Sequence, residues 1–172
     1  MFSTFTARAR RAAPAVPVAV LLALTLSSCT PGAIAAVSQA TSAPAAPAGL
    51  NAEEARFVDL LNAERARAGL GALTVHNGAT AVARGWAAEL ARRGSLDHNP
   101  DIARQVEANV TTAWVRIGEN LGSGGDVDSV HRALMASPTH RRNILEGAFD
   151  LVGVGVVRSG GVLWMCMVFV AV

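Results

Sequence analysis

The fold is decided by the C-terminal stretch LVGVGVVRSGGVLWMCMVFVAV, residues 151–172. Two uncharged runs rich in β-branched residues, 151–157 and 162–170, are separated by Arg158-Ser159-Gly160-Gly161. This pattern predicts a β-hairpin. Both faces of its strands are apolar, so we expect other elements to cover the sheet on both sides.

Two amphipathic segments upstream can provide that cover. Asn51 and Glu54 have the spacing of a capping box, and the apolar residues after them recur at helical spacing as far as Gly69. This pattern predicts a helix over about 52–68. The same periodicity, followed by a glycine stop, predicts a second helix over 77–93.

Two shorter helices are predicted closer to the hairpin. Residues 126–135 have helical periodicity, and a further helix is predicted to begin at Ser137-Pro138 and to run to Leu145. Serine is a preferred N-cap residue, and proline suits the first helical position.

The segment between the two pairs of helices has weaker signals. Residues 95–113 have little periodicity, 114–117 resemble a short strand, and Gly122–Gly125 suggest a flexible loop. Taken together, the elements predict an α+β fold, a three-layer α/β/α sandwich with a small antiparallel sheet.

The N-terminal residues 1–28 have the features of a secretory signal peptide. Three arginines precede an apolar run of about a dozen residues, whereas a helix that spans a bilayer needs ~20. Leu26-Ser27-Ser28-Cys29 resembles a bacterial lipobox, which predicts lipidation at Cys29. Cleavage after Ala33-Ile34-Ala35 is the alternative, and it would release a soluble protein.

Both alternatives export the chain, as a membrane-anchored lipoprotein of the cell envelope or as a secreted protein. Residues 29–49 are rich in Ala, Pro and Ser and predict a tether, and residues 50–172 predict one folded domain. The domain contains a single thiol, Cys166, within an apolar run. It therefore has no disulfide framework, and we expect Cys166 to be a buried small hydrophobic residue.

The charge pattern argues against a nucleic-acid partner. The chain has no lysine, and three of its 15 basic residues lie in the signal segment, so the remainder has slightly more acidic than basic groups. A protein that binds nucleic acid needs a basic patch or stripe.

Three polar residues have neighbours that single them out: His98 before Asn99-Pro100, Glu119 between Gly118 and Asn120, and His140 at the start of the Ser137 helix. Each also has an ordinary structural alternative, such as a surface histidine or a turn carboxylate. The helix start favours a neutral His140, and Glu119 could orient that ring. His76 and His131 have no comparable context.

Five segments, in this order along the chain, carry a resemblance to a known family: LNAERARAGL (61–70), Asp97-His98, IGENL (117–121), SPTHRRNIL (137–145) and VGVGV (152–156). They resemble the CAP superfamily of cysteine-rich secretory, antigen five and pathogenesis-related proteins, whose unit is also called the SCP-like extracellular domain. The likeness is closest to the disulfide-free bacterial branch.

The resemblance implies a three-layer fold, an extracellular location and a cleft of two histidines and two acids. His98, Glu119 and His140 match three of these cleft positions, whereas the second acid has no match and Leu134 occupies a family tryptophan position. The final strand has Met165-Cys166-Met167 where the bacterial branch commonly has an aromatic residue, Thr and Gln. Supporting positions in the matched motifs are Asn120, Ser137, Arg141 and Asn143.

We therefore expect a ligand-binding module whose cleft takes a lipid, a glycan or a cell-wall fragment. No cofactor is required, although His98 and His140 could hold a divalent metal. One alternative is a hydrolase, metal-assisted or with His140 as base and Glu119 as its orienting residue. This alternative lacks a nucleophile, since Ser137 is expected to be an N-cap and Cys166 to be buried. A surface interaction or adhesion protein is the third possibility.

Overall fold

The computed structural model describes residues 5–6 and 49–172. The predicted signal segment, apart from Phe5 and Thr6, lies outside the described residues, as do Cys29 and most of the predicted tether. In the part of the chain that is described, no helix is both long enough and apolar enough to cross a membrane.

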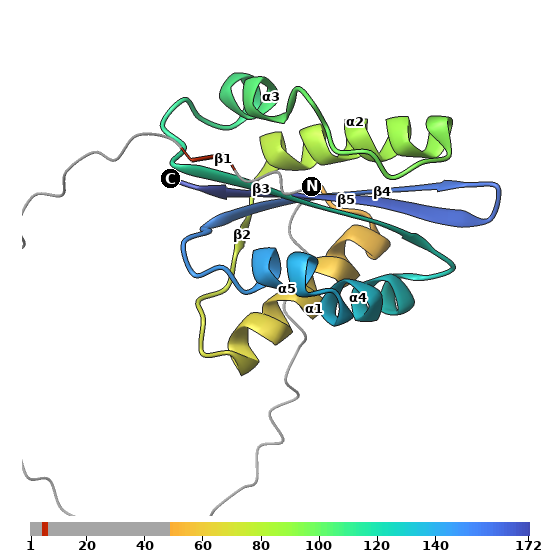
Figure 1. Ribbon diagram of the computed structural model, residues 1–172, viewed down its shortest axis with the longest axis horizontal. Coiled ribbons are helices and arrows are strands. Elements are labelled where there is room, and N and C mark those ends of the chain that lie inside the picture. The colour runs from red at the N-terminus through yellow and green to blue at the C-terminus, as the bar shows by residue number, and fades with distance from the viewer. Residues whose placement is uncertain (1–4, 7–48) are drawn as a thin grey trace, which may run out of the picture. The chain divides into compact units, whose positions relative to one another are not determined.

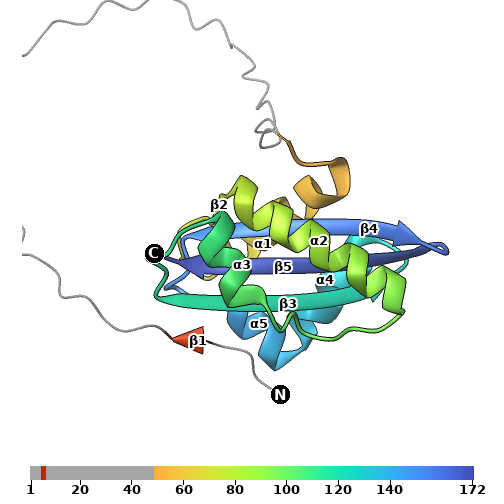
Figure 2. The same ribbon diagram turned by 90° about the horizontal axis from the view of Figure 1, so that it is seen from above.

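The described chain forms one five-stranded sheet and five helices (Figures 1 and 2). The strand order is β1-β3-β5-β4-β2. The strands are β1 (Phe5–Thr6), β2 (Thr74–Val75), β3 (Arg116–Gly124), β4 (Leu151–Ser159) and β5 (Val162–Ala171). The helices are α1 (Ala52–Arg67), α2 (Asn77–Arg93), α3 (Ile102–Asn109), α4 (Val127–Ala136) and α5 (Pro138–Ile144).

The helices cover both faces of the sheet, which confirms the predicted α+β sandwich. Helices α2 and α3 lie on one face, and α1, α4 and α5 lie on the other (Figure 1). Each face has its own apolar core. The sheet is antiparallel except where the short strand β2 pairs in parallel with β4, so it is mixed rather than wholly antiparallel.

The C-terminal hairpin forms as the sequence predicts. β4 and β5 are joined by Gly160-Gly161, which have φ angles of +58° and +79°. Positive φ at both central residues is the geometry of the two-residue turns that suit twisted strands. Side chains on both faces of β5 are buried, as expected for a strand covered on both sides.

The two long helices also agree with their sequence signals. Asn51 and Glu54 form the capping box of α1. Glu54 is fully buried and accepts two hydrogen bonds from the Arg84 guanidinium of α2. At the end of α2, Gly94 has a φ of +69°, as expected of a glycine stop.

Two predictions for the middle of the chain need correction. Helix α3 lies in the segment 95–113, where the sequence does not predict a helix. Its sequence signal is weak because only Ile102 and Val106 of its eight residues are buried and its N-cap side chain makes no capping hydrogen bond. The predicted flexible loop Gly122–Gly125 is wrong, since β3 continues to Gly124. A Cβ on Gly122 would lie 2.6 Å from Val130 of α4, so a glycine here allows α4 to pack closely on the strand.

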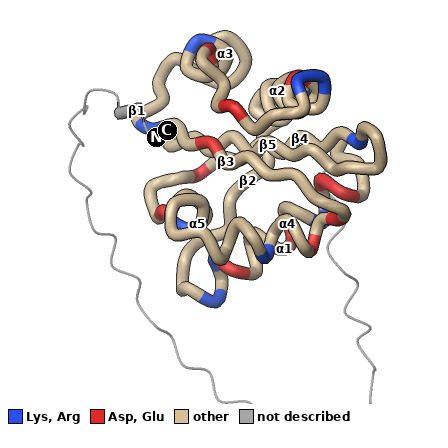
Figure 3. Tube along the Cα trace, turned by 45° about the vertical axis from the view of Figure 1, so that its right-hand side comes forward, with Lys and Arg blue, Asp and Glu red and all other residues tan. Residues whose placement is uncertain are grey.

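Acidic and basic residues are interspersed over the described chain and do not form a single-sign stripe (Figure 3).

Candidate functional site

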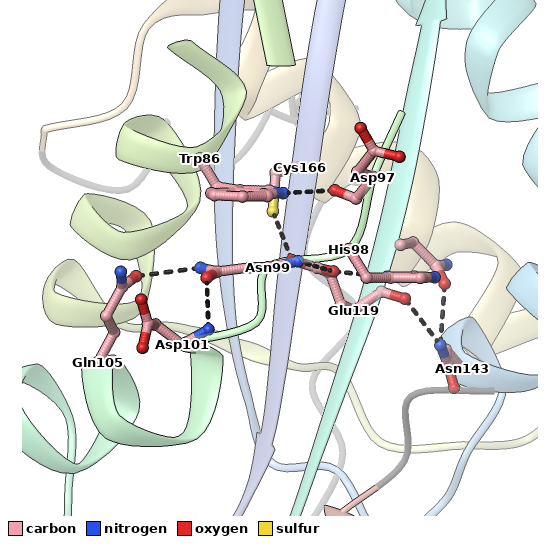
Figure 4. Close-up of polar contacts among 10 residues, drawn as sticks. Trp86, Asp97, His98, Asn99, Asp101, Gln105, Glu119, Asn143 and Cys166 are labelled. Atoms are coloured by element: carbon pink, nitrogen blue, oxygen red, sulfur yellow. Dashed lines mark hydrogen bonds and ion pairs between the residues drawn. The ribbon is translucent and has the colours of Figure 1, made fainter. Parts of the chain in front are cut away.

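The centre of the site is the buried carboxylate of Glu119, on β3. Its Oε1 lies 2.5 Å from Nδ1 of His98 and accepts a 3.1 Å hydrogen bond from the backbone N–H of Asn99. Its Oε2 lies 3.7 Å from Sγ of Cys166, whose thiol donates to it. The side chain of Glu119 is only 2% exposed. A buried carboxylate needs such donors, because burial without them is costly (Figure 4).

His98 reaches Glu119 because hydrogen bonds hold the loop on either side of it. The indole N–H of Trp86, on α2, donates to the carbonyl of Asp97 over 2.9 Å. The side-chain amide of Asn99 donates to Oε1 of Gln105, on α3, over 3.0 Å (Figure 4). The loop is therefore fixed to both helices that cover this face of the sheet.

The hydrogen bond to Glu119 raises the pKa of His98, and burial opposes this effect only in part. Because Nδ1 is bonded to the carboxylate, Nε2 is the nitrogen left for a ligand. The His98 side chain is 41% exposed, so a ligand can reach it. The raised pKa favours the charged form of the His98 ring beside the buried carboxylate.

His140 is placed by two asparagines that join α5 to β3. Nδ2 of Asn120 donates to the carbonyl of His140 over 2.9 Å. Nδ2 of Asn143 donates to the carbonyl of Glu119 and to Oδ1 of Asn120, over 3.1 and 2.9 Å. Both asparagines therefore hold α5 against β3 beside Glu119 and His140.

Burial lowers the pKa of His140, and the positive charge of His98 lowers it further. The direction is the one expected from the helix start, but its causes are burial and the charge of His98. The influence of His98 on His140 places the two imidazoles in one electrostatic environment. His98 contacts Glu119 of β3 directly, and the backbone of His140 is hydrogen-bonded to Asn120, the next residue of β3.

Two details of the sequence analysis need correction. Glu119 has His98 as its hydrogen-bond partner, whereas the sequence analysis paired it with His140. Ser137 occupies the N-cap position of α5, but its side chain makes no capping hydrogen bond. Arg141 is exposed on α5, where it lines a groove of about 350 Å³ with Pro138 and Leu145.

The other two histidines lie elsewhere and have structural positions. Nδ1 of His76 accepts from the backbone N–H of Ala79 over 3.4 Å and so caps α2. His131 is buried in α4, and its Nε2 lies 3.7 Å from Oε1 of Glu64, too far for a hydrogen bond.

Sequence reasoning missed the donors that complete the site. Cys166 is fully buried, as predicted, but its contact with Glu119 depends on the pairing of β3 with β5, which places it opposite Leu121. Asn99 follows His98 directly and precedes a proline. That context indicates a loop residue but not its backbone contact with Glu119.

The residues present do not fit a metal centre. Within residues 5–6 and 49–172, no group of three or more His, Cys, Asp and Glu side chains could hold a metal ion. Catalytic zinc usually has three protein ligands, whereas only His98 and His140 are candidates here. We assign no chemical step to a metal.

Comparison with known proteins gives a family match over most of the folded domain. The family model described as CAP, cysteine-rich secretory protein family, matches residues 58–169. The uncharacterized protein YkwD of Bacillus subtilis (strain 168) is 32% identical over 125 residues, which are 68% of this chain. The match covers 47% of YkwD, so the chain spans about half the length of this curated relative.

Solved structures agree with the fold. An outer surface protein from Borrelia burgdorferi superposes with a TM-score of 0.62 at 17% identity, covering 67% of this chain and 90% of that one. An extracellular protein with an SCP domain from Bacillus anthracis also gives 0.62, at 22% identity, covering 70% of this chain and 40% of that one. At these identities the likeness concerns the fold alone.

Proposed function

The chain belongs to the cysteine-rich secretory protein (CAP) family, and from this premise we propose that it is an exported cell-envelope protein. On this proposal it binds a lipid, a glycan or a cell-wall fragment through His98, Glu119 and His140. The ligand carries a hydroxyl or anionic group that the two imidazoles recognise. The binding requires no cofactor and involves no nucleic acid.

The observation that supports this proposal best is the short contact between His98 and the buried carboxylate of Glu119. The carboxylate fixes the orientation of the ring and favours its charged form, so Nε2–H faces a ligand as a charged donor. Hydrogen bonds from charged donors are roughly twice as strong as neutral ones.

His140 complements His98. Its pKa is lowered, so the neutral ring can accept a hydrogen bond from a ligand hydroxyl. A charged donor and a neutral acceptor near the same strand suit a ligand that has both an anionic oxygen and a hydroxyl group. Polar groups of this kind fix the orientation of a ligand in a small-molecule site.

Binding can be tested with the protein in which Cys29→Ala prevents acylation, so that no acyl chain binds the vesicles. The two probes are vesicles of phosphatidylglycerol and soluble peptidoglycan fragments. We expect one probe to bind, and His98→Ala and His140→Ala to weaken its binding about tenfold or more. His76→Asn is the control, because asparagine keeps a side chain that can cap α2. Equal binding by all four proteins would favour a surface interaction or adhesion protein.

Attachment to the membrane is a separate part of the proposal. Acylation of Cys29, with residues 29–49 as a tether, would hold the domain at the envelope surface. Mass spectrometry of the cellular protein should find an acylated N-terminal cysteine. A mature chain that begins at Ala36 would instead indicate cleavage after Ala33-Ile34-Ala35 and a secreted protein.

One observation favours a hydrolase as the second candidate. A carboxylate bonded to Nδ1 of a histidine is the arrangement of a general base, in which Nε2 takes the proton. In this alternative His98, rather than His140, is the base. Turnover of peptidoglycan fragments that is lost in both His98→Ala and Glu119→Gln would support it.

A further inference from the structure

A second hollow lies on the helical face that carries the His98 loop. It is a groove of about 380 Å³ between α2 and α3. Its apolar lining comes from Ala81, Val82, Gly85 and Trp86 of α2. A Cβ on Gly85 would have no atom within 4 Å, so the groove is open above this glycine.

Polar side chains of both helices complete the lining: Glu89 of α2, and Gln105 and Asn109 of α3. Arg92 and Arg93 hydrogen-bond to Glu89 and lower its pKa to about 2, so the carboxylate is an ionised acceptor. Gln105 uses its Oε1 for Asn99, and Asn109 uses its Nδ2 for the carbonyl of Gln105. Nε2 of Gln105 and Oδ1 of Asn109 are thus left to face a ligand.

We propose that this groove binds an N-acetylated sugar residue of a glycan. The acetamido methyl group would lie on Ala81 and Val82, and its carbonyl would accept from Nε2 of Gln105. Its N–H and the ring hydroxyls would donate to Glu89 and to Oδ1 of Asn109. A fatty-acyl chain fits less well, because it would leave these polar groups without partners.

Hydrogen bonds connect the lining of the groove to the loop that carries His98. The chain neighbours of His98 are each bonded to a residue that lines the groove: Asp97 to Trp86 and Asn99 to Gln105 (Figure 4). A sugar that contacts Trp86 and Gln105 therefore acts on both sides of the His98 loop. Coupling between two binding sites is reciprocal, so any change that the sugar makes in the affinity at His98 is matched by an equal change in the affinity of the groove when His98 binds its ligand.

The test uses the mature protein with tri-N-acetylchitotriose as probe and maltotriose, which lacks acetamido groups, as its counterpart. We expect saturable shifts of the Trp86 indole N–H resonance and of the His98 ring resonances with chitotriose, and binding about tenfold weaker with maltotriose.

Gly85→Leu is the decisive variant. It fills the open space above α2 and replaces a poor helix former by a good one, so we expect the protein to remain folded. Its affinity for chitotriose should fall about tenfold or more, as should that of Gln105→Ala, whereas Arg104→Ala, exposed on α3, should bind normally. Unchanged binding by Gly85→Leu, or no saturable shift in the wild type, would overturn the proposal.

The groove proposal and the proposed function can fail separately. His98→Ala leaves the groove lining intact and should bind chitotriose with an affinity within about threefold of the wild type. Loss of binding to the phosphatidylglycerol vesicles in His98→Ala, with chitotriose binding retained, would support both. Chitotriose binding lost only in His98→Ala, and retained in Gly85→Leu, would place the sugar at the histidines and overturn the groove.

Discussion

Oε1 of Glu119 lies 2.5 Å from Nδ1 of His98, a residue 21 positions earlier in the chain. The contact joins the loop between α2 and α3 to strand β3. It exists because Trp86 and Gln105 hold the loop against β3, and because β3 pairs with β5 over its whole length.

Arg65 is expected to hold the turn after α5. It is almost fully buried on α1, and its guanidinium donates to the carbonyls of Gly71, Ile144, Glu146 and Phe149. Arg65→Met keeps the bulk but leaves these acceptors without their donor, so the free energy of unfolding should fall by about 3 kcal/mol or more. Urea denaturation measures this.

Arg67→Met is the matched control. Arg67 is exposed on the same helix and pairs with Glu64 at the surface, so its replacement should change the free energy of unfolding by less than about 0.5 kcal/mol. Equal losses in the two variants would show that the buried guanidinium has no special part in the fold.

His131 should make the fold sensitive to mild acid. Burial lowers its pKa, and Glu64 compensates only in part. In the unfolded chain this histidine titrates near the ordinary value of about 6.5. The unfolded state therefore binds more protons as the pH falls below 6.5, and the free energy of unfolding falls with it.

His131→Leu should remove this contribution. The difference in the free energy of unfolding between variant and wild type should be constant above about pH 7.5. It should move in favour of the variant as the pH falls through about 6.5, because the unfolded wild type takes up more protons there than the folded wild type does. Parallel stability curves for the two proteins over this range would show that His131 has the same pKa in the folded and unfolded states, and would contradict the prediction.

Cys166 should be unreactive in the folded protein. It is fully buried, and burial together with the nearby charge of Glu119 raises the pKa of its thiol. Only the thiolate reacts with iodoacetamide. Mass spectrometry of the peptide that contains Cys166 should find it unmodified under native conditions and fully modified in urea. Rapid native labelling would contradict the packing of β5.

Much of the fold could be predicted from local signals. The capping box of α1, the glycine stop of α2 and the Gly160-Gly161 turn are all encoded by residues close together in the sequence. The glycines of β3 could not be interpreted in this way. Gly122 is required by Val130 of α4, and a contact between two elements leaves no periodic signal in either one.

The site was predictable only in part for the same reason. The family resemblance singled out His98, Glu119 and His140, and the structure pairs His98 with Glu119. The resemblance could not show which histidine the carboxylate binds, because that depends on how the loop crosses the sheet. The contribution of Cys166 follows from strand register, which lies beyond any motif of consecutive residues.

The most direct test of the account is NMR titration of the four histidines in the wild type and in Glu119→Gln. Glutamine keeps an oxygen that can accept from Nδ1 of His98 but removes the charge. The pKa of His98 should therefore fall, and that of His140 should rise because its neighbour is less often charged, while His76 and His131 stay unchanged. An unchanged pKa of His98 would show that Glu119 is only a structural residue of β3 and would contradict the proposed site.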